Sequence, residues 1–218
     1  MRLILLFLFC SACFTGCTQN TSKKSTNTSN AADLKVGASC EGCEAIFECP
    51  VPFPQLNNTD TLPGFTLSGP AILVTGTIYQ RDGHTPARDI VLYIYHTDLQ
   101  GRYATAGATK TWEKRHGTIR GWIRTGADGT YKFYSLLPAS YPNSQNPRHI
   151  HPIIKEPGKT EYWIDEFVFD NDPLLPATEK NRNKPVGGSG LIHIADQNGL
   201  MVCRRDIILG LNVSNYPN

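Results

Sequence analysis

Two histidines separated by one residue, His149 and His151, are the first candidates for chemistry in this chain. They lie near the end of the stretch "SYPNSQNPRHIHP", which runs from Ser140 to Pro152. In a β-strand, residues i and i+2 point to the same face, so the two imidazoles would project side by side with Ile150 buried behind them. This arrangement is a natural two-nitrogen chelate for a metal ion. For a bare HxH pattern, however, two surface or hydrogen-bonded histidines are the default interpretation.

Two tyrosines could complete such a metal site. Tyr141 ends "LLPASY" and is kept extended by Pro142, and Tyr103 ends "LQGRY" just after an expected strand. Phenolate oxygen is a hard anionic donor and imidazole is a borderline one. Two of each suit a non-haem Fe(III) ion, because a ferric centre can hold phenols deprotonated well below their free pKa of about 10. Zinc or copper would more often recruit cysteine or a third histidine.

The elements that must position these residues are mostly β-strands. Ala71–Tyr79 is β-branched and apolar, and Asp89–His96 is apolar or aromatic in both alternating phases, which indicates a strand covered on two sides. No amphipathic helix of three turns appears. Short strands between Gly/Pro-rich turns predict an all-β fold, an antiparallel β-sandwich of prealbumin- or immunoglobulin-like type with long loops. The other expected strands are Gly117–Thr125, Gly129–Leu136, His149–Lys155, Tyr162–Phe169, Gly190–Ala195 and Val202–Leu209.

One pattern in this region also fits a domain without enzymatic activity. "VTGTIYQRDGHTPARDIVLYIY" followed by "TGADGTYKFYSLLPASYP" has the general form shared by many small seven-stranded extracellular modules. Prealbumin-like and carboxypeptidase-regulatory-like domains of this kind only bind other molecules or act as spacers between domains. A lipid-anchored β-sandwich binding or spacer module without turnover is therefore the alternative hypothesis.

Taken in order, the motifs resemble the intradiol ring-cleaving dioxygenases, the catechol and protocatechuate dioxygenase family, in a short lipoprotein form. "GPAILVTGTIYQRDGHTPARDIVLYIYHTDLQGRY" resembles the strand pair that ends in the first iron tyrosine, and "RGWIRTGADGTYKFYSLLPASYP" resembles the segment that ends in the second. "RHIH" resembles the iron dihistidine, and "EYWIDEFVFDNDPL" resembles the strand after it. The similarity covers roughly Gly69 to Pro176.

The resemblance implies an enzyme, an intradiol aromatic ring dioxygenase with non-haem Fe(III). It makes Tyr103, Tyr141, His149 and His151 the metal ligands. Tyr141 is also catalytic, because a catechol bound as the dianion would displace it. Reaction with O2 would then give a cis,cis-muconate-type product. Arg148 is the catalytic candidate for stabilising the developing anion.

Two positions differ from the family pattern. The family arginine usually stands three residues before the first histidine, where this chain has Asn146, and Arg148 instead directly precedes His149. On a strand the side chain of Arg148 would point away from that of His149. Glu166 stands where the family has a glutamine, and its carboxylate could act as a base or repel an anionic intermediate.

Three other residues could belong to the site. His96 lies close in sequence to Tyr103 and could line the mouth of the site. Trp112 and Trp122 could wall an aromatic pocket. For all three, a structural role is the default interpretation.

The N-terminus predicts export and a lipid anchor. "MRLILLFLFCSACFTGC" carries one positive charge, an apolar run too short to span a bilayer, and small residues that lead to Cys17. "FTGC" resembles a bacterial lipoprotein cleavage box, with the weaker candidate "CSAC" ending at Cys13; an ordinary secretory signal is the alternative. We expect a lipoprotein signal peptide at 1–17, a flexible polar tether at 18–35 and one β-sandwich domain at 36–218, attached to the cell envelope on its periplasmic or outer-membrane side.

Four cysteines then remain in the exported domain: Cys40, Cys43, Cys49 and Cys203. Structural disulfides are the expected state, with three connectivities open. A link from the Cys40–Cys49 segment to Cys203 would connect the two ends of the domain. "CEGC" could instead be a thiol redox pair; half of a zinc site is less fitting, because no second CxxC follows.

The charge of the 218-residue chain argues against nucleic acid as a partner. The formal net charge is +2, and the lysines and arginines are scattered along the sequence. The expected partners are a small aromatic diol, O2 and, through the lipid on Cys17, a membrane. Homo-oligomerisation is left open.

Overall fold

The computed structural model describes residues 32–66 and 69–218. The expected signal peptide at 1–17 and most of the tether at 18–35 lie outside these residues. Ala32–Asn218 forms one compact unit, and its backbone pairing begins at Leu34, just before the expected domain boundary. Leu34 N donates to Gly158 O, and Thr160 N donates to Leu34 O, each at 2.9 Å. Within the described ranges, no helix is both long and apolar enough to cross a membrane.

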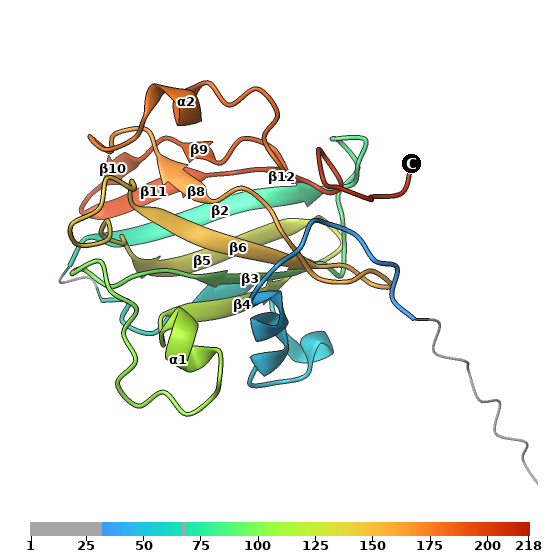
Figure 1. Cartoon of the computed structure of the whole chain (residues 1–218), viewed down its shortest axis with the longest axis horizontal. Coiled ribbons are helices and arrows are strands. Elements are labelled where there is room, and N and C mark those ends of the chain that lie inside the picture. The colour runs from blue at the N-terminus through green and yellow to red at the C-terminus, as the bar shows by residue number, and fades with distance from the viewer. Residues whose placement is uncertain (1–31, 67–68) are drawn as a thin grey trace, which may run out of the picture. The chain divides into compact units, whose positions relative to one another are not determined.

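Two six-stranded sheets confirm the predicted sandwich (Figure 1). Among the described residues, six of the ten strand pairs are antiparallel, and of the four parallel pairs three lie in the first sheet and one in the second. The first sheet has the order β1 (Thr59–Thr61), β5 (Thr130–Leu136), β2 (Ala71–Tyr79), β11 (Leu200–Arg204), β10 (Ala195–Gln197), with β12 (Ile207–Ile208) also paired to β2. The second has the order β4 (Arg120–Arg124), β3 (Val91–Tyr95), β6 (His149–Lys155), β8 (Phe167–Phe169), β9 (Leu191–Ile192), with β7 (Tyr162–Trp163) also paired to β6.

Helices are short throughout the part of the chain that the structure describes, as the sequence predicts. α1 (Glu113–His116) and α2 (Ala177–Lys180) are single turns, and η1 (Cys43–Glu48) and η2 (Phe53–Gln55) are 3-10 segments. In Figure 1, α1 and the η1–η2 segment lie on one side of the strands and α2 lies on the opposite side.

Apolar residues cover both faces of the second sheet, which confirms the expectation for β3. Leu92 and Ile94 belong to the large core between the sheets. Val91 and Tyr93 point the other way, into a smaller cluster formed with Ile46 of η1. Strand alternation therefore gives the second sheet an outer face that is partly covered by the N-terminal segment.

Several expected strands are interrupted. Tyr162–Phe169 was expected as one strand but forms β7 and β8, which pair with different parts of β6: Ile153–Ile154 and His149–Ile150. The break lies at Asp165, whose carboxylate accepts a hydrogen bond from Val186 N in a distant loop. The regions expected at Gly190–Ala195 and Val202–Leu209 likewise each divide, into β9 and β10 and into β11 and β12.

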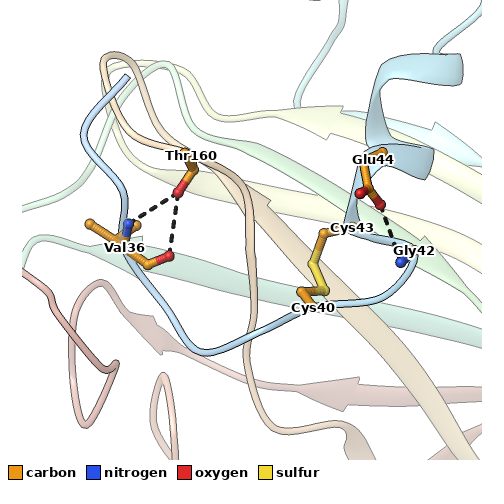
Figure 2. The surroundings of a disulfide bond; sticks show 6 residues. All are labelled: Val36, Cys40, Gly42, Cys43, Glu44 and Thr160. Atoms are coloured by element: carbon orange, nitrogen blue, oxygen red, sulfur yellow. Dashed lines mark hydrogen bonds between the residues drawn. A yellow bond between two sulfur atoms is a disulfide. The ribbon is translucent and has the colours of Figure 1, made fainter. Parts of the chain in front are cut away.

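The expected disulfide to Cys203 is wrong. Cys40 bonds to Cys43 within the "CEGC" sequence (Figure 2). Cys49 and Cys203 are free. Cys203 packs in the core between the sheets, whereas Cys43 packs in the cluster on the outer face of the second sheet, so that sheet separates them. The N-terminal segment is held instead by hydrogen bonds, including one that Val36 N donates to the side-chain Oγ1 of Thr160 at 3.0 Å (Figure 2).

His96 is a buried structural residue, so the hypothesis that it lines the site mouth is wrong. Its exposed fraction is 0%, and both ring nitrogens are satisfied. Nδ1 donates to Thr97 O at 2.8 Å, and Nε2 accepts from Ser135 Oγ at 2.8 Å. Burial lowers the pKa of His96 to about 4, well below its usual value of 6.5.

We expect acid to destabilise the domain through His96. Between pH 6.5 and 4 the unfolded state binds the proton that the folded state excludes, so the free energy of unfolding falls as the pH falls, by up to about 3 kcal/mol for this one group. Denaturant titrations across this range should show a shallower pH slope for His96→Gln than for the wild type. His84→Gln, in an exposed turn, is the control, and an unchanged slope in His96→Gln would contradict the assignment.

Candidate metal centre

Strand β6 places His149 and His151 side by side on the outer face of the second sheet. Ile150 between them is fully buried in the core. Both imidazoles are half-buried, and their Nε2 atoms lie 3.1 Å apart. The predicted orientation of these three residues is therefore confirmed.

Tyr103 and Tyr141 reach the same point from two loops. Tyr103 follows the turn after β3, and Tyr141 follows the end of β5. Four donor atoms, two Oη and two Nε2, thus converge in one cluster. The distances are Tyr103 Oη–Tyr141 Oη 2.6 Å, Tyr103 Oη–His151 Nε2 2.9 Å, Tyr141 Oη–His149 Nε2 3.1 Å and Tyr141 Oη–His151 Nε2 3.3 Å.

The second nitrogen of each histidine fixes the position of the ring proton. His149 Nδ1 lies 2.7 Å from Pro147 O, a carbonyl that can only accept, so Nδ1 carries the proton. His151 Nδ1 faces Glu166 Oε1 at 3.6 Å, and a carboxylate likewise favours a proton on that nitrogen. Both Nε2 atoms therefore present lone pairs to the cluster, as metal-bound histidines do when another group orients them.

Too few protons are present to satisfy this cluster. Five donor–donor contacts lie between 2.6 and 3.3 Å, but only the two phenol hydroxyls carry protons. At least three contacts therefore bring lone pair against lone pair, which a cation at the centre would relieve. The spacing suits an ion with bonds of about 2.0–2.1 Å, whose tetrahedral edges are about 3.3 Å.

The two phenols differ in how readily they give up a proton. Burial, followed by the hydrogen bond and charge of Tyr141, raises the pKa of Tyr103 far above its usual value. Burial also raises the pKa of Tyr141, although the hydrogen bond from Tyr103 opposes this effect. Burial lowers the pKa of His149, which favours the neutral imidazole that a metal requires.

Backbone contacts hold the two tyrosine loops together. The Asp98 carboxylate accepts from Gln100 N and Arg102 N at 2.9 Å each, which shapes the turn before Tyr103. Asp98 O also accepts from Ala139 N at 3.2 Å, in the loop that leads to Tyr141. The turn closes at Gly101, which has a φ of 71° and lies so close to Ser140 O that a Cβ would be 1.9 Å from it.

Sequence reasoning missed Tyr95 as a wall of the site. Tyr95 pairs with His151 across β3 and β6, and the two rings stack at 4.6 Å and 17°. The other face of Tyr95 stacks on His116 at 3.8 Å. The signal was available in the alternation of β3, because Tyr93 and Tyr95 share the face on which His149 and His151 stand.

Arg148, which directly precedes β6, is turned away from the four donors. Its Nε lies 3.3 Å from Asp172 Oδ2, and its Nη2 donates to Asn171 Oδ1 at 3.1 Å. It lines a separate cavity with Leu137 and Ser140. The cluster of four donors instead borders the carboxylate of Glu166, whose pKa is held at about 2 chiefly by the contact with His151.

Neither tryptophan lines the cavity beside the donors. Trp122 is buried in the outer cluster, and its Nε1 donates to Ile46 O at 2.8 Å. Trp112 packs against His116 and Arg115. The expectation that they wall an aromatic pocket there is therefore wrong, and their default interpretation as packing residues holds.

A cavity of about 370 Å³ opens beside the donors, which is large enough for a single aromatic ring. Tyr141, His149 and His151 line it, together with Gln145 and Asn146. Among residues 32–66 and 69–218, no three His, Cys, Asp or Glu side chains gather as a metal ligand set. A metal ion here would therefore need tyrosine ligands.

Comparisons with known proteins agree with this chemistry. A family model described as a dioxygenase matches residues 55–184. Catechol 1,2-dioxygenase 1 of Acinetobacter lwoffii is 25% identical over 124 residues, which is 50% of this chain and 38% of that protein. The protocatechuate 3,4-dioxygenase beta chain of Burkholderia cepacia is 26% identical over 113 residues, 49% of this chain and 48% of that one. The chain thus spans less than half of either relative.

Solved structures support the fold. The dioxygenase domain of a dioxygenase carbohydrate-binding protein fusion from Streptomyces sp. SirexAA-E superposes with a TM-score of 0.53 at 20% identity. The match covers 74% of this chain and 94% of that one. At this identity the likeness describes the arrangement of the strands and carries no statement about substrate.

We expect Gly101→Ala to separate the tyrosine loops. The new methyl group would overlap Ser140 O, so the substitution should lower the free energy of unfolding by about 3 kcal/mol and weaken metal uptake at least about tenfold. Gly107→Ala is a matched control, since Gly107 also has a positive φ (79°) but has nothing within 4 Å of its Cβ position. Equal effects of the two variants, measured by denaturation and by metal content after dialysis, would contradict this account.

Proposed function

The chain belongs to the intradiol ring-cleavage dioxygenase family, and we propose that it is a non-haem Fe(III) enzyme that cleaves a catechol-type diol with O2 to a cis,cis-muconate-type product. The observation that carries this proposal is the cluster of Tyr103, Tyr141, His149 and His151, in which four donor atoms share two protons. Two oxygen and two nitrogen donors suit Fe(III) by ligand type.

The bound ion would supply Lewis-acid chemistry, drawing electron density from the catechol ring and making it reactive toward O2. The protein residues do the positioning. Pro147 O and Glu166 hold the proton on Nδ1 of each histidine, so that both Nε2 lone pairs would be free to hold the ion. Tyr103 is held by its contacts with Tyr141 and His151.

Tyr141 is the tyrosine that a substrate can reach. Tyr141 lines the cavity with the two histidines, whereas Tyr103 is not among the residues of that lining. With an ion bound, Tyr141 would be the ligand on the cavity side, and its Oη would be the group within reach of a proton from an incoming catechol hydroxyl. The neutral amides of Gln145 and Asn146 are placed to donate hydrogen bonds to the developing anion in place of Arg148.

We expect the protein loaded with Fe(III) to show a visible phenolate-to-iron absorption band and to consume O2 with catechols. Tyr103→Phe should weaken or abolish the band and reduce ring cleavage at least about 100-fold, because it removes a ligand. Tyr134→Phe, on β5 with its ring against Phe65, is the matched control and should keep both properties. A colourless, iron-free protein after reconstitution would overturn the proposal.

Binding without turnover is the second candidate function. The observation that favours it is the pairing of Arg148 with Asp172 and Asn171, which leaves the cavity wall without a cation. Oxygen uptake with a panel of catechols separates the two functions. Bound iron and bound catechol without O2 consumption would support the binding module.

We also propose that the chain is exported and anchored in the cell envelope by a lipid on Cys17. The basis is the sequence "FTGC" followed by a polar segment. In a bacterial host, the wild type should incorporate radiolabelled fatty acid and partition into the detergent phase of Triton X-114. Cys17→Ser should lose both properties and Cys13→Ser should keep them. Labelling that persists in Cys17→Ser would contradict the assignment.

A further inference from the structure

The cavity at the metal centre is lined by two carboxylates, Glu166 and Glu179, and by no lysine or arginine side chain among the described residues. His151 and Glu166 also line a second cavity of about 200 Å³, where Glu41 adds a carboxylate. Glu166 therefore borders both spaces that a ring substituent could enter.

The two arginines near the site are already paired with carboxylates, and Lys180 lines a neighbouring cavity rather than the one beside the donors. Arg148 faces Asp172 in a separate cavity. Arg182 binds Glu179 through Nη2 at 2.6 Å and also lies 3.4 Å from Asp165, so these three residues together carry a net charge of −1. Glu166 adds a second negative charge beside His151, and among the described residues it forms no ion pair with an arginine or a lysine.

A substituent in this cavity would meet negative potential. A carboxylate on the ring would be repelled and would lose hydration with no cation to compensate it. An ammonium group would be attracted by Glu166 and could donate hydrogen bonds to its oxygens. The cavity volume of about 370 Å³ leaves room for one ring with a short side chain.

We propose that this site selects catechols whose ring substituent carries a positively charged amine over catechols that carry a carboxylate, and that Glu166 and Glu179 set this preference. The inference rests on the proposed function, because it assumes that a catechol occupies the cavity beside the four donors. It adds the class of substrate, which the donor set alone does not specify.

Three 4-substituted catechols of similar size but different charge test the proposal. They are 4-(2-aminoethyl)catechol, 4-methylcatechol and 3,4-dihydroxybenzoate. Their dissociation constants are measured by calorimetry on the Fe(III)-loaded protein without O2, and kcat/KM is measured separately with O2. We expect the amine to bind about tenfold tighter than the methyl compound, and the carboxylate to bind about tenfold more weakly, with both differences shrinking as salt is added.

Two variants assign the preference to its residues. Glu166→Gln and Glu179→Gln should each reduce the ratio of amine to carboxylate affinity several-fold, and Glu179→Gln also frees the charge of Arg182. Because Glu166 faces His151, the comparison uses this ratio rather than absolute affinity. Glu161→Gln, before β7 at the Ile154 end of β6, removes the same charge and should leave the ratio unchanged.

The possible results distinguish a failure of the charge preference from a failure of the proposed ring-cleaving function. If 3,4-dihydroxybenzoate binds as tightly as 4-methylcatechol, or if the ratio does not change in either variant, the charge preference is wrong while the ring-cleaving function stands. If none of the three catechols binds or is cleaved, the proposed function fails and the substrate preference fails with it.

Discussion

The alternation of strand β6 is the constraint on which the site depends. Ile150 and Ile154 are fully buried between the two sheets, so His149 and His151 must stand on the opposite face. The pairing of Tyr95 with His151 on one side and of His149 with Val168 on the other fixes this register. A slip by one residue would turn both imidazoles into the apolar core, so the same packing that stabilises the sandwich also aims the ligands.

Loops supply the oxygen donors, and they are controlled by a different kind of contact. Neither tyrosine has a strand to set its direction, and the Asp98 turn and the close approach of Gly101 to Ser140 do this instead. The chain separates Tyr103 from Tyr141 by 38 positions, yet their hydroxyls are 2.6 Å apart. The sheet therefore fixes the two histidines, whereas the two tyrosines lie on loops, from which a tyrosine could move.

The sequence allowed the strands and the convergence of the four donor side chains to be predicted much better than the contacts between other distant segments. β6 was expected at the residues where it forms, because an HxH pattern around a buried isoleucine has only one arrangement on a covered sheet. The division of Tyr162–Phe169 and the Cys40–Cys43 pairing depend on which segments meet in three dimensions, and periodicity carries no such information. His96 was misjudged for the same reason, because nearness to Tyr103 in sequence gave no hint of the Ser135 hydroxyl that accompanies its burial.

Glu166 affects both kinds of metal ligand at the site, the histidines and the tyrosines, and together these effects limit which metal ions fit. Its carboxylate orients His151 and attracts a cation, which alone would suit many divalent ions. The two phenols, in contrast, favour an ion of high charge. Burial first, and to a lesser degree the charge of Glu166, raise the pKa values of Tyr103 and Tyr141, so deprotonating them costs more here than in water. A trivalent ion would offset more of this cost than a divalent one, because its attraction for two phenolate oxygens is stronger. The donor types and the electrostatics around them therefore both support the ferric ion proposed above.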